Sequence, residues 1–245
     1  MPADFLYRLC RRYVNYVNGQ NNSDIRTNGE LRWLREALPH CTTVFDVGAN
    51  IGDWASLALQ INPIMNIHCF EPSLNTFERL RKSLTAHSAH VTLNPFGLSA
   101  THEMKMLHLF GDCAGTNSLY PREGLNIHQS RSETVHLETL DQYCQDQGLG
   151  RIDLLKIDVE GHELSVLQGA ALMLEQGCIE RIQFEYGGTF IDARILLKDI
   201  FGLLTPLGYR LYKIYPSRLA YAERYEQRFE NFQYQNWVAL RPQPV

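Results

Sequence analysis

The sequence lacks any long uninterrupted run of apolar residues. Its amino-terminal segment is rich in apolar side chains, but Asp4, Arg8, Arg11 and Arg12 break it up, so it does not resemble the apolar core of a signal peptide. No later stretch reaches the roughly 20 apolar residues that a membrane-spanning helix needs. We therefore expect no transmembrane segment and assign the protein to the cytoplasm.

The sequence also lacks paired cysteines and an excess of positive charge. Its six cysteines are scattered without a C-x-x-C pair, which indicates reduced thiols rather than a disulfide framework. The net charge of -4 argues against nucleic acid as a partner, because nucleic-acid binders usually carry a basic excess. The sequence does not determine the oligomeric state, and a homo-oligomer is one of the alternatives.

The length and composition fit one α/β domain with an appended segment. The chain has 245 residues, 44% of them hydrophobic, and shows neither internal repeats nor a low-complexity linker. Apolar residues recur at helical spacing from Phe5 to Val17, which predicts an amphipathic helix ending near Asn18. Such a helix either packs on its own domain or touches a membrane surface through its arginines. We expect packing, and divide the chain into a helical segment, residues 1–40, and a main domain, residues 41–245.

Apolar, β-rich runs then alternate with helical runs along the chain. This alternation is typical of parallel strands joined by crossover helices, and so of a sheet with helices on both faces. The strands that we expect in the core lie at residues 43–47, 66–70, 90–93, 152–157, 181–185, 209–215 and 236–240.

A glycine-containing turn follows the first of these strands. In V-F-D-V-G-A-N-I-G-D-W, Gly48 and Gly52 remove Cβ atoms that would block a ligand, and Asn50 tolerates a left-handed backbone. A helix that starts after such a turn points backbone N–H groups at the ligand. Asp46, at the end of the strand, is placed to meet a polar or cationic ligand group.

The second strand ends in the sequence F-E-P, which contains Glu71 and Pro72. A carboxylate at this edge can accept hydrogen bonds from both hydroxyls of a ribose, so the pair of strand ends predicts a site for an adenosine-bearing cofactor. NAD is one candidate, but its G-x-G-x-x-G turn is absent. S-adenosylmethionine (SAM) has no phosphate to bind, and its cationic groups favour carboxylates such as that of Asp46.

With these motifs the chain resembles the FkbM family of SAM-dependent methyltransferases. The resemblance covers about residues 28–190 and includes N-G-E from Asn28, F-E-P from Phe70, T-L-D from Thr139, and L-L-K-I-D-V-E-G-H-E-L from Leu154. It implies a Rossmann-like class I methyltransferase fold with a mostly parallel, seven-stranded sheet. It also implies SAM as methyl donor and O-methylation of sugars, glycolipid precursors or natural products.

Further candidate residues follow the later strands. Phe96 and Gly97 are placed to flank the adenine, and the polar loop around Ser118 is a candidate cover for the cofactor. Asp158 is assigned to the methyl-transfer site, where it also borders the cofactor. Glu160 and His162 are alternative general bases for the acceptor hydroxyl.

Three acidic residues at this sheet edge leave a second chemistry open. Asp158, Glu160 and Glu185 could instead hold a divalent cation such as Mg²⁺, which would lower the pKa of the acceptor hydroxyl. We expect no metal, because the sequence has no compact ligand motif. An NAD-dependent oxidoreductase and a non-catalytic interaction module remain the alternative functions.

Overall fold

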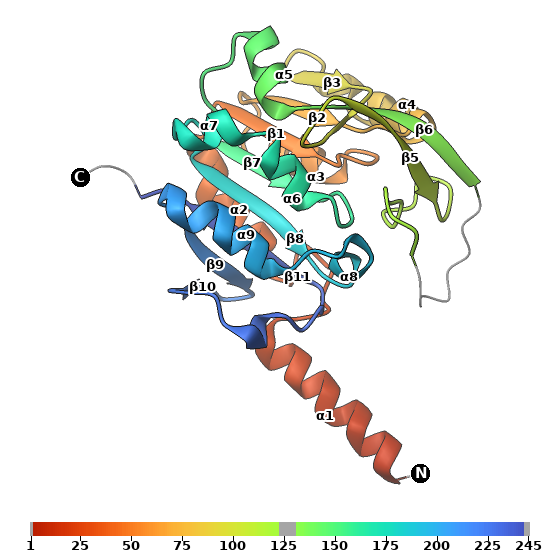
Figure 1. Ribbon diagram of the computed structural model, residues 1–245, viewed down its shortest axis with the longest axis vertical. Helices are drawn as coiled ribbons and strands as arrows, with labels where there is room; N and C mark the ends of the chain where they lie inside the picture. Colours follow the sequence, from red (N-terminus) through yellow and green to blue (C-terminus); the bar gives the residue numbers. More distant parts are fainter. Residues whose placement is uncertain (1, 123–130, 243–245) are drawn as a thin grey trace.

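The computed structural model describes residues 2–122 and 131–242 and is built around one large β-sheet (Figure 1). The order of its strands is β10-β9-β11-β8-β7-β1-β2-β3. Their bounds are β1 (Thr43–Val47), β2 (Asn66–Phe70), β3 (Val91–Asn94), β7 (Leu154–Ile157), β8 (Arg181–Tyr186), β9 (Arg210–Tyr215), β10 (Arg218–Ala222) and β11 (Gln235–Leu240). All neighbours from β8 to β3 pair in parallel, while β11 runs antiparallel to both β8 and β9.

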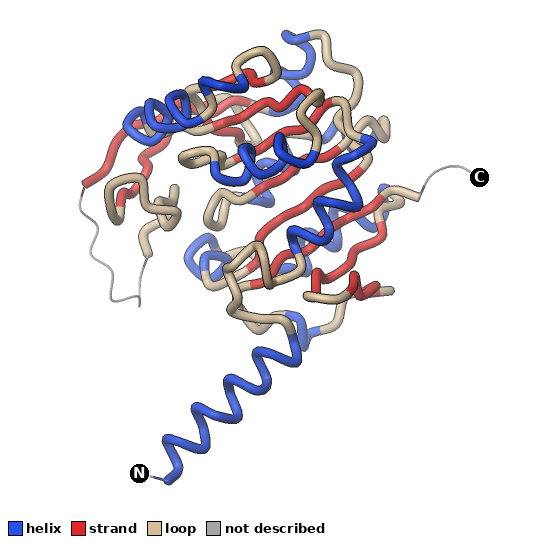
Figure 2. Tube along the Cα trace, turned by 180° about the vertical axis from the view of Figure 1, so that it is seen from behind, coloured by secondary structure: helices blue, strands red, loops and turns tan. Residues whose placement is uncertain are grey.

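Helices cover both faces of this sheet (Figure 2). Each face has its own hydrophobic core, because the buried strands present apolar side chains in both directions. One face is covered by α2 (Glu30–Ala37), α3 (Asp53–Ile61) and α4 (Leu74–Ser83). The other is covered by α5 (Leu140–Gln147), α6 (Glu163–Gln168), α7 (Ala171–Glu175) and α9 (Leu197–Leu204). The predicted α/β class with a mostly parallel, two-sided sheet is confirmed.

The direction of the chain reverses beside β1. From β1 the chain continues to β2 and β3 on one side, and it later returns to β7 and β8 on the other. In open α/β sheets, the crevice at such a reversal, at the carboxyl ends of the strands, is where ligands bind. Asp46 of β1 lies in register with Cys69 of β2 and Lys156 of β7, so the three strand ends meet at one place.

Among the described residues, the large sheet has eight strands, one more than expected. The extra strand is β10, which pairs antiparallel with β9 at the edge and contains Tyr221. A separate small sheet has the order β4-β6-β5, formed by β4 (Gly97–Leu98), β5 (Glu103–Leu109) and β6 (Arg131–Glu138). The remaining short elements are η1 (Leu38–His40), η2 (Thr85–His87), α8 (Thr189–Ala193), η3 (Thr205–Leu207) and η4 (Gln227–Phe229).

The amino-terminal segment divides into two parts that behave differently. Helix α1 (Pro2–Asn18) forms where expected, but it does not pack on the domain: it extends away from the body (Figure 1), and side chains such as Phe5 and Tyr13 are exposed. Helix α2, in contrast, buries Trp33 and Leu34 in the core. Helix α2 thus packs on the domain and α1 does not, because amphipathic spacing predicts a helix without identifying what covers its apolar face.

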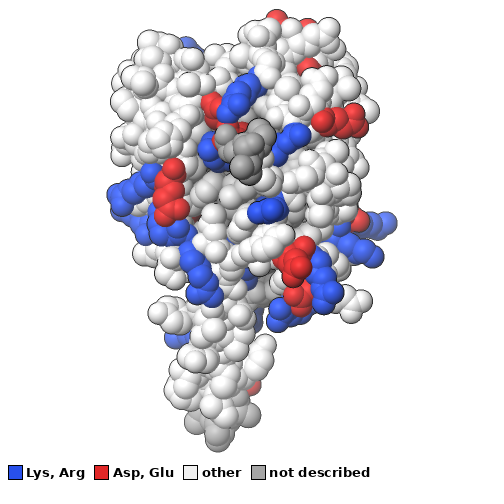
Figure 3. Space-filling view, turned by 90° about the vertical axis from the view of Figure 1, so that its left-hand side faces the viewer, with Lys and Arg blue, Asp and Glu red and all other residues white. Residues whose placement is uncertain are grey.

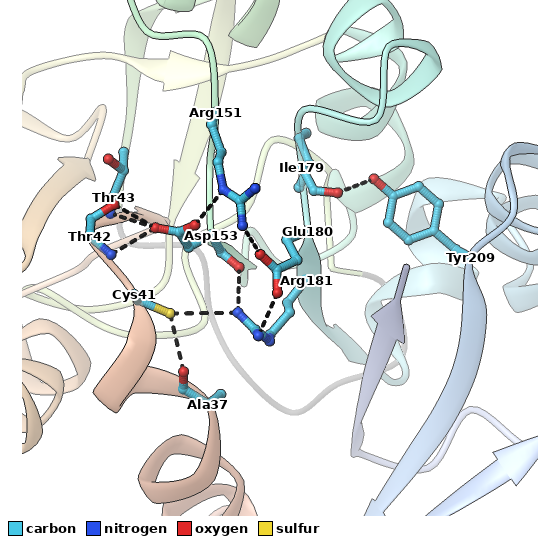
Figure 4. A network of polar contacts seen from close by, with 10 residues as sticks. All are labelled: Ala37, Cys41, Thr42, Thr43, Arg151, Asp153, Ile179, Glu180, Arg181 and Tyr209. Carbon is cyan, nitrogen blue, oxygen red and sulfur yellow. Dashed lines mark hydrogen bonds and ion pairs between the residues drawn. The ribbon is translucent and has the colours of Figure 1, made fainter. Parts of the chain in front are cut away.

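The opposite, amino-terminal edge of the sheet is closed by a polar network (Figure 4). Asp153 accepts hydrogen bonds from the backbone N–H groups of Thr42 and Thr43, at 2.7 and 3.0 Å, and pairs with Arg151. Arg151 also pairs with Glu180. These contacts join the starts of three neighbouring strands and leave the carboxyl edge for the site.

Candidate functional site

A pocket of about 700 Å³ opens at the carboxyl edge beside the glycine turn. Gly48 and Asn50 line it, and both have the left-handed backbone expected of the turn, with φ of 79° and 47°. A Cβ on Gly48 would lie 1.9 Å from the backbone oxygen of Asp158, so no other residue fits this close approach of the β1 and β7 ends.

Glu71 lies in this pocket and is held there by the backbone. Its carboxylate accepts hydrogen bonds from the N–H groups of Asn50, at 3.1 Å, and Ser73, at 2.9 Å. Burial raises the pKa of Glu71 to about 7, although these two donors oppose the shift. The side chain is therefore fixed at the end of β2, where a ligand with hydroxyl donors would stabilise its ionised form.

The wall next to Glu71 is apolar. Pro72 and Gly97, both predicted cofactor contacts, line the pocket there, and further leucines from the small sheet and its loop join them. The apolar contributors that sequence reasoning missed are Leu98, Leu107, Leu119 and Leu137. An apolar wall beside a carboxylate is complementary to the two halves of an adenosine, because the base offers an apolar ring and the ribose offers hydroxyl donors.

Three predicted cofactor contacts lie outside the lining of this pocket and pack or bind elsewhere. Gly52 is absent from the lining and lets α3 approach α4, since a Cβ there would lie 2.8 Å from Leu80. The Phe96 ring packs on Phe70, with ring centroids 5.8 Å apart. Ser118 is buried and donates a hydrogen bond to the backbone oxygen of Glu160 at 2.7 Å, so it anchors the loop. The sequence could not separate residues that line the pocket from residues that pack behind it.

Asp46 contacts a cationic group of the protein itself. Its side chain is fully buried, and Lys156 Nζ lies 3.0 Å from its Oδ1. Burial lowers the pKa of Lys156, but the carboxylates of Asp46 and Asp158 outweigh that effect and raise the pKa overall. Lys156 also donates to the backbone oxygen of Gly48 at 3.4 Å. The cation that Asp46 meets is thus a lysine of the protein, and the pair holds the glycine turn in place.

Asp158 connects this pocket to a second one. It lines the first pocket and also a pocket of about 640 Å³ on the far side of the Gly48 turn. Lys156 Nζ lies 3.4 Å from its Oδ2, and the side chain is 36% exposed, so it remains open to a ligand. The second pocket is lined by the polar or aromatic residues Glu30, Trp54, Lys156, Gln183, Tyr234 and Asn236, among others.

Glu30, the last residue of the N-G-E motif, lines the second pocket and is hydrogen-bonded to its neighbours there. Its carboxylate accepts hydrogen bonds from the side-chain amides of Asn28 at 3.1 Å, Gln183 at 2.6 Å and Asn236 at 3.0 Å. Burial raises its pKa. The motif therefore ties the start of α2 to β8 and β11 and shapes the wall of the pocket.

The three predicted metal or catalytic carboxylates do come together. Ligand atoms of Asp158, Glu160 and Glu185 all lie within 4.8 Å of one another. Burial raises the pKa of Glu160 to about 8, with the charge of Asp158 adding to the shift and Arg122 opposing it at a distance of 3.0 Å. The pKa of Glu185 is raised by burial and by the neighbouring carboxylates. Crowded carboxylates of this kind share protons or bind a cation.

Arg122 reaches this cluster from the polar loop. Its guanidinium contacts Glu160 and, through Nε at 3.3 Å, Asp192 of α8. Sequence reasoning missed Arg122 and Lys156. A lysine within the apolar run L-L-K-I was a usable signal, because buried lysines are nearly always paired with an acid; Arg122 had no comparable signal.

His162 lines the first pocket but is unsuited to accept a proton. Its Nδ1 lies 2.8 Å from the hydroxyl of Tyr120, and its Nε2 lies 3.0 Å from that of Ser99. Burial lowers its pKa to about 3. Glu163 next to it accepts from the backbone N–H groups of Val159 and Gly161, each at 3.1 Å, so its role is to hold the turn. Of the two predicted bases, this geometry favours Glu160.

The fold and the crevice define the class of protein. The strand order, the turn after β1 and the carboxylate at the end of β2 are those of a class I methyltransferase fold. The model of the methyltransferase FkbM domain matches residues 46–211, and the chain belongs to this family.

Relatives and a solved structure agree with this membership. The chain is 30% identical over 159 residues to the methyltransferase sdnD of Sordaria araneosa, covering 54% of this chain and 61% of that protein. It is 28% identical over 170 residues to the hexuronic acid methyltransferase AglP of Haloferax volcanii, covering 69% and 66%. The chain therefore spans about two thirds or less of these relatives. The structure of methyltransferase FkbM from Methylobacillus flagellatus aligns with a TM-score of 0.51 at 14% identity, over 81% of this chain and 43% of that one.

Proposed function

We propose that the protein is a SAM-dependent O-methyltransferase that methylates a hydroxyl group of a saccharide, a glycolipid precursor or a natural product. The observation that carries this proposal is the first pocket, whose lining combines Glu71 and an apolar wall with the carboxylates of Asp158 and Glu160. The family membership supports the reaction class. The relative AglP is named for a hexuronic acid, a molecule whose nucleophiles are all oxygens, which supports an oxygen acceptor.

The described residues fit SAM. Glu71 is fixed to accept from ribose hydroxyls, and Pro72, Gly97 and Leu137 form the apolar wall for adenine. When bound, SAM supplies a methyl group activated by its sulfonium. The polar lining of the second pocket suits the amino-acid end of the cofactor or a hydroxyl-rich acceptor, and either one reaches Asp158 from there.

The protein's own contribution is alignment and proton transfer. Methyl transfer is an in-line displacement, so holding the acceptor oxygen in line supplies much of the rate. Glu160, whose pKa is raised to about 8, is matched to take the hydroxyl proton near neutral pH. Asp158 orients the acceptor at the junction of the two pockets, and Lys156 fixes Asp158.

A divalent cation is the alternative use of Asp158, Glu160 and Glu185. We propose proton transfer without a metal, since Arg122 already supplies a positive charge to Glu160. Turnover should then survive EDTA followed by desalting. Loss of turnover with EDTA and recovery with Mg²⁺ would show that the three carboxylates bind a metal ion. Glu160 would then no longer be assigned as the general base.

Two measurements test the proposed function. Isothermal titration should detect binding of SAM, or of its demethylated product, at micromolar strength, and no binding of NADH. Candidate acceptors incubated with labelled SAM should include one that gains the mass of a CH₂ group. Binding of NADH in place of SAM would favour an oxidoreductase. Cofactor binding and cellular function that persist in Asp158→Ala would favour a non-catalytic module.

We also propose the cytoplasm as the compartment. All six cysteines are free thiols, and the buried ones Cys41, Cys69 and Cys144 belong to the core. Free thiols persist in reducing compartments. Within the described part of the chain, no helix combines the length and apolarity needed to cross a membrane.

A further inference from the structure

Helix α1 has its charged and apolar residues on separate sides. Successive residues of an α-helix are about 100° apart, which places Arg8, Arg11 and Arg12 in one arc. Asp4, Asn15 and Asn18 fall in the same arc. The remaining arc of about 200° contains only apolar, aromatic or thiol side chains among those described: Phe5, Leu6, Tyr7, Leu9, Cys10, Tyr13, Val14, Tyr16 and Val17.

This apolar arc is exposed along the whole helix. Phe5 is 70% exposed, Leu9 54% and Tyr16 82%. In Figure 3 the helix is the narrow projection at the bottom, and most of the surface that it presents there is uncharged. A contiguous apolar surface of this extent marks a binding surface for another partner.

The width of the arc and its charged border identify the partner. A second helix covers only a narrow seam of its neighbour, and an arc of about 200° is wider than such a seam. A lipid surface covers it completely, with the helix lying in the plane of the interface. The polar arc carries three arginines and one aspartate, although the whole chain has a net charge of -4. Positive charge beside a wide apolar face is complementary to anionic headgroups.

We propose that α1 is an interfacial helix that docks the protein on an anionic membrane surface. Tyr7, Tyr13 and Tyr16 suit this position, because tyrosine rings are favoured where an apolar layer meets water. At 17 residues with four charges, the helix lies on the surface and does not cross it.

The chain connects this helix directly to the site. The N–H of Asn21, just after α1, donates to the backbone oxygen of Tyr234 at 2.8 Å. Ser23, Ile25 and Tyr234 line the second pocket. A docked α1 therefore brings the second pocket near the membrane. From there the pocket takes an acceptor carried on a lipid. This last step rests on the proposed function, whereas the docking does not.

Vesicle flotation of the full chain tests the docking. Vesicles of phosphatidylcholine with phosphatidylglycerol should carry the protein to the top of the gradient, and phosphatidylcholine alone should bind it less. The double variant Leu6→Glu/Leu9→Glu should weaken binding by about tenfold or more for each leucine, because each loses its apolar burial. The matched control Ile64→Glu/Leu172→Glu changes two residues that are exposed elsewhere, at 77% and 59%, and should float like the parent protein.

A second variant separates charge from apolar burial. Replacing Arg8, Arg11 and Arg12 with glutamine should reduce binding to the anionic vesicles by about fivefold per arginine and leave binding to neutral vesicles unchanged.

No flotation of the parent protein, or equal flotation of the leucine variant, would overturn the proposal. So would a dimer in sedimentation analysis that the leucine variant abolishes, which would assign the face to a second copy. Titration with SAM reports on the cofactor pocket separately, so failure of docking and failure of the proposed function are distinguishable.

Discussion

The two ends of the first pocket use the same chemical group in different ways. At one end Glu71 is a single carboxylate held by two backbone N–H groups. At the other, Asp158 and Glu160 lie within 4.8 Å of Glu185, which is outside the lining of this pocket, and they are balanced by Arg122 and Lys156. Burial raises the pKa of Glu71 and of Glu160, yet the carboxylate held by the backbone suits binding and the crowded one, which the loop contacts, suits proton transfer. The partners of a carboxylate thus decide its role.

The largest expected effect comes from the crowded end. Glu160→Gln removes the base but keeps the shape, and should lower kcat by about a hundredfold or more while SAM affinity changes little. In the parent enzyme only deprotonated Glu160 accepts a proton, so kcat should rise with pH and level off above about 8. That rise should be absent from the pH profile of the variant. A retained pH profile would assign the proton transfer elsewhere.

The next effect is on stability and concerns the buried ion pair between Lys156 and Asp46. Lys156→Met leaves the fully buried Asp46 without its cation and should lower the free energy of unfolding by about 3 to 5 kcal/mol. Urea denaturation measures this loss. Lys82→Met removes a lysine from the last turn of α4 and serves as the control, and Asp46→Asn combined with Lys156→Met should recover part of the stability. An additive double variant would contradict the pairing.

At the binding end we expect a smaller effect. Glu71→Gln should weaken SAM binding by about 2 kcal/mol, since a neutral amide is a poorer acceptor for ribose hydroxyls than a carboxylate. Calorimetric titration measures the change, and kcat at saturating SAM should stay close to that of the parent. If Glu71→Gln instead lowered kcat with unchanged affinity, the division of roles between the two ends would be wrong.

The smallest effect on turnover belongs to His162. Its ring nitrogens contact Tyr120 and Ser99, so His162→Asn should change kcat by less than about tenfold but lower the melting temperature, because each hydroxyl loses a hydrogen-bond partner. Parallel melting and kinetic measurements distinguish these outcomes. A loss of turnover as large as that of Glu160→Gln would restore His162 as a candidate base.

Local motifs predicted much of the fold and part of the site. The bounds expected for β1 and β2 agree with the structure, because short apolar runs that end at glycine, proline or acidic residues are well marked. Glu71, Asn50 and Asp158 lie at the pocket as expected, since parallel strands bring their carboxyl ends to one edge.

The remainder depends on packing that a motif does not encode. Gly52 and Phe96 follow strands as the pocket residues do, yet they face α4 and the core. The edge strand β10 pairs with β9 across a short turn, at residues where no strand was expected. Neither the direction of a side chain nor the cover over an amphipathic helix can be derived from local spacing alone.

A crystal structure with the demethylated product of SAM tests the central claim most directly. The account predicts the ribose hydroxyls within hydrogen-bond distance of the Glu71 carboxylate, adenine between Pro72 and Leu137, and the sulfur facing Asp158. Two results would contradict it: a nucleoside bound elsewhere, or no ligand in this pocket at a saturating concentration.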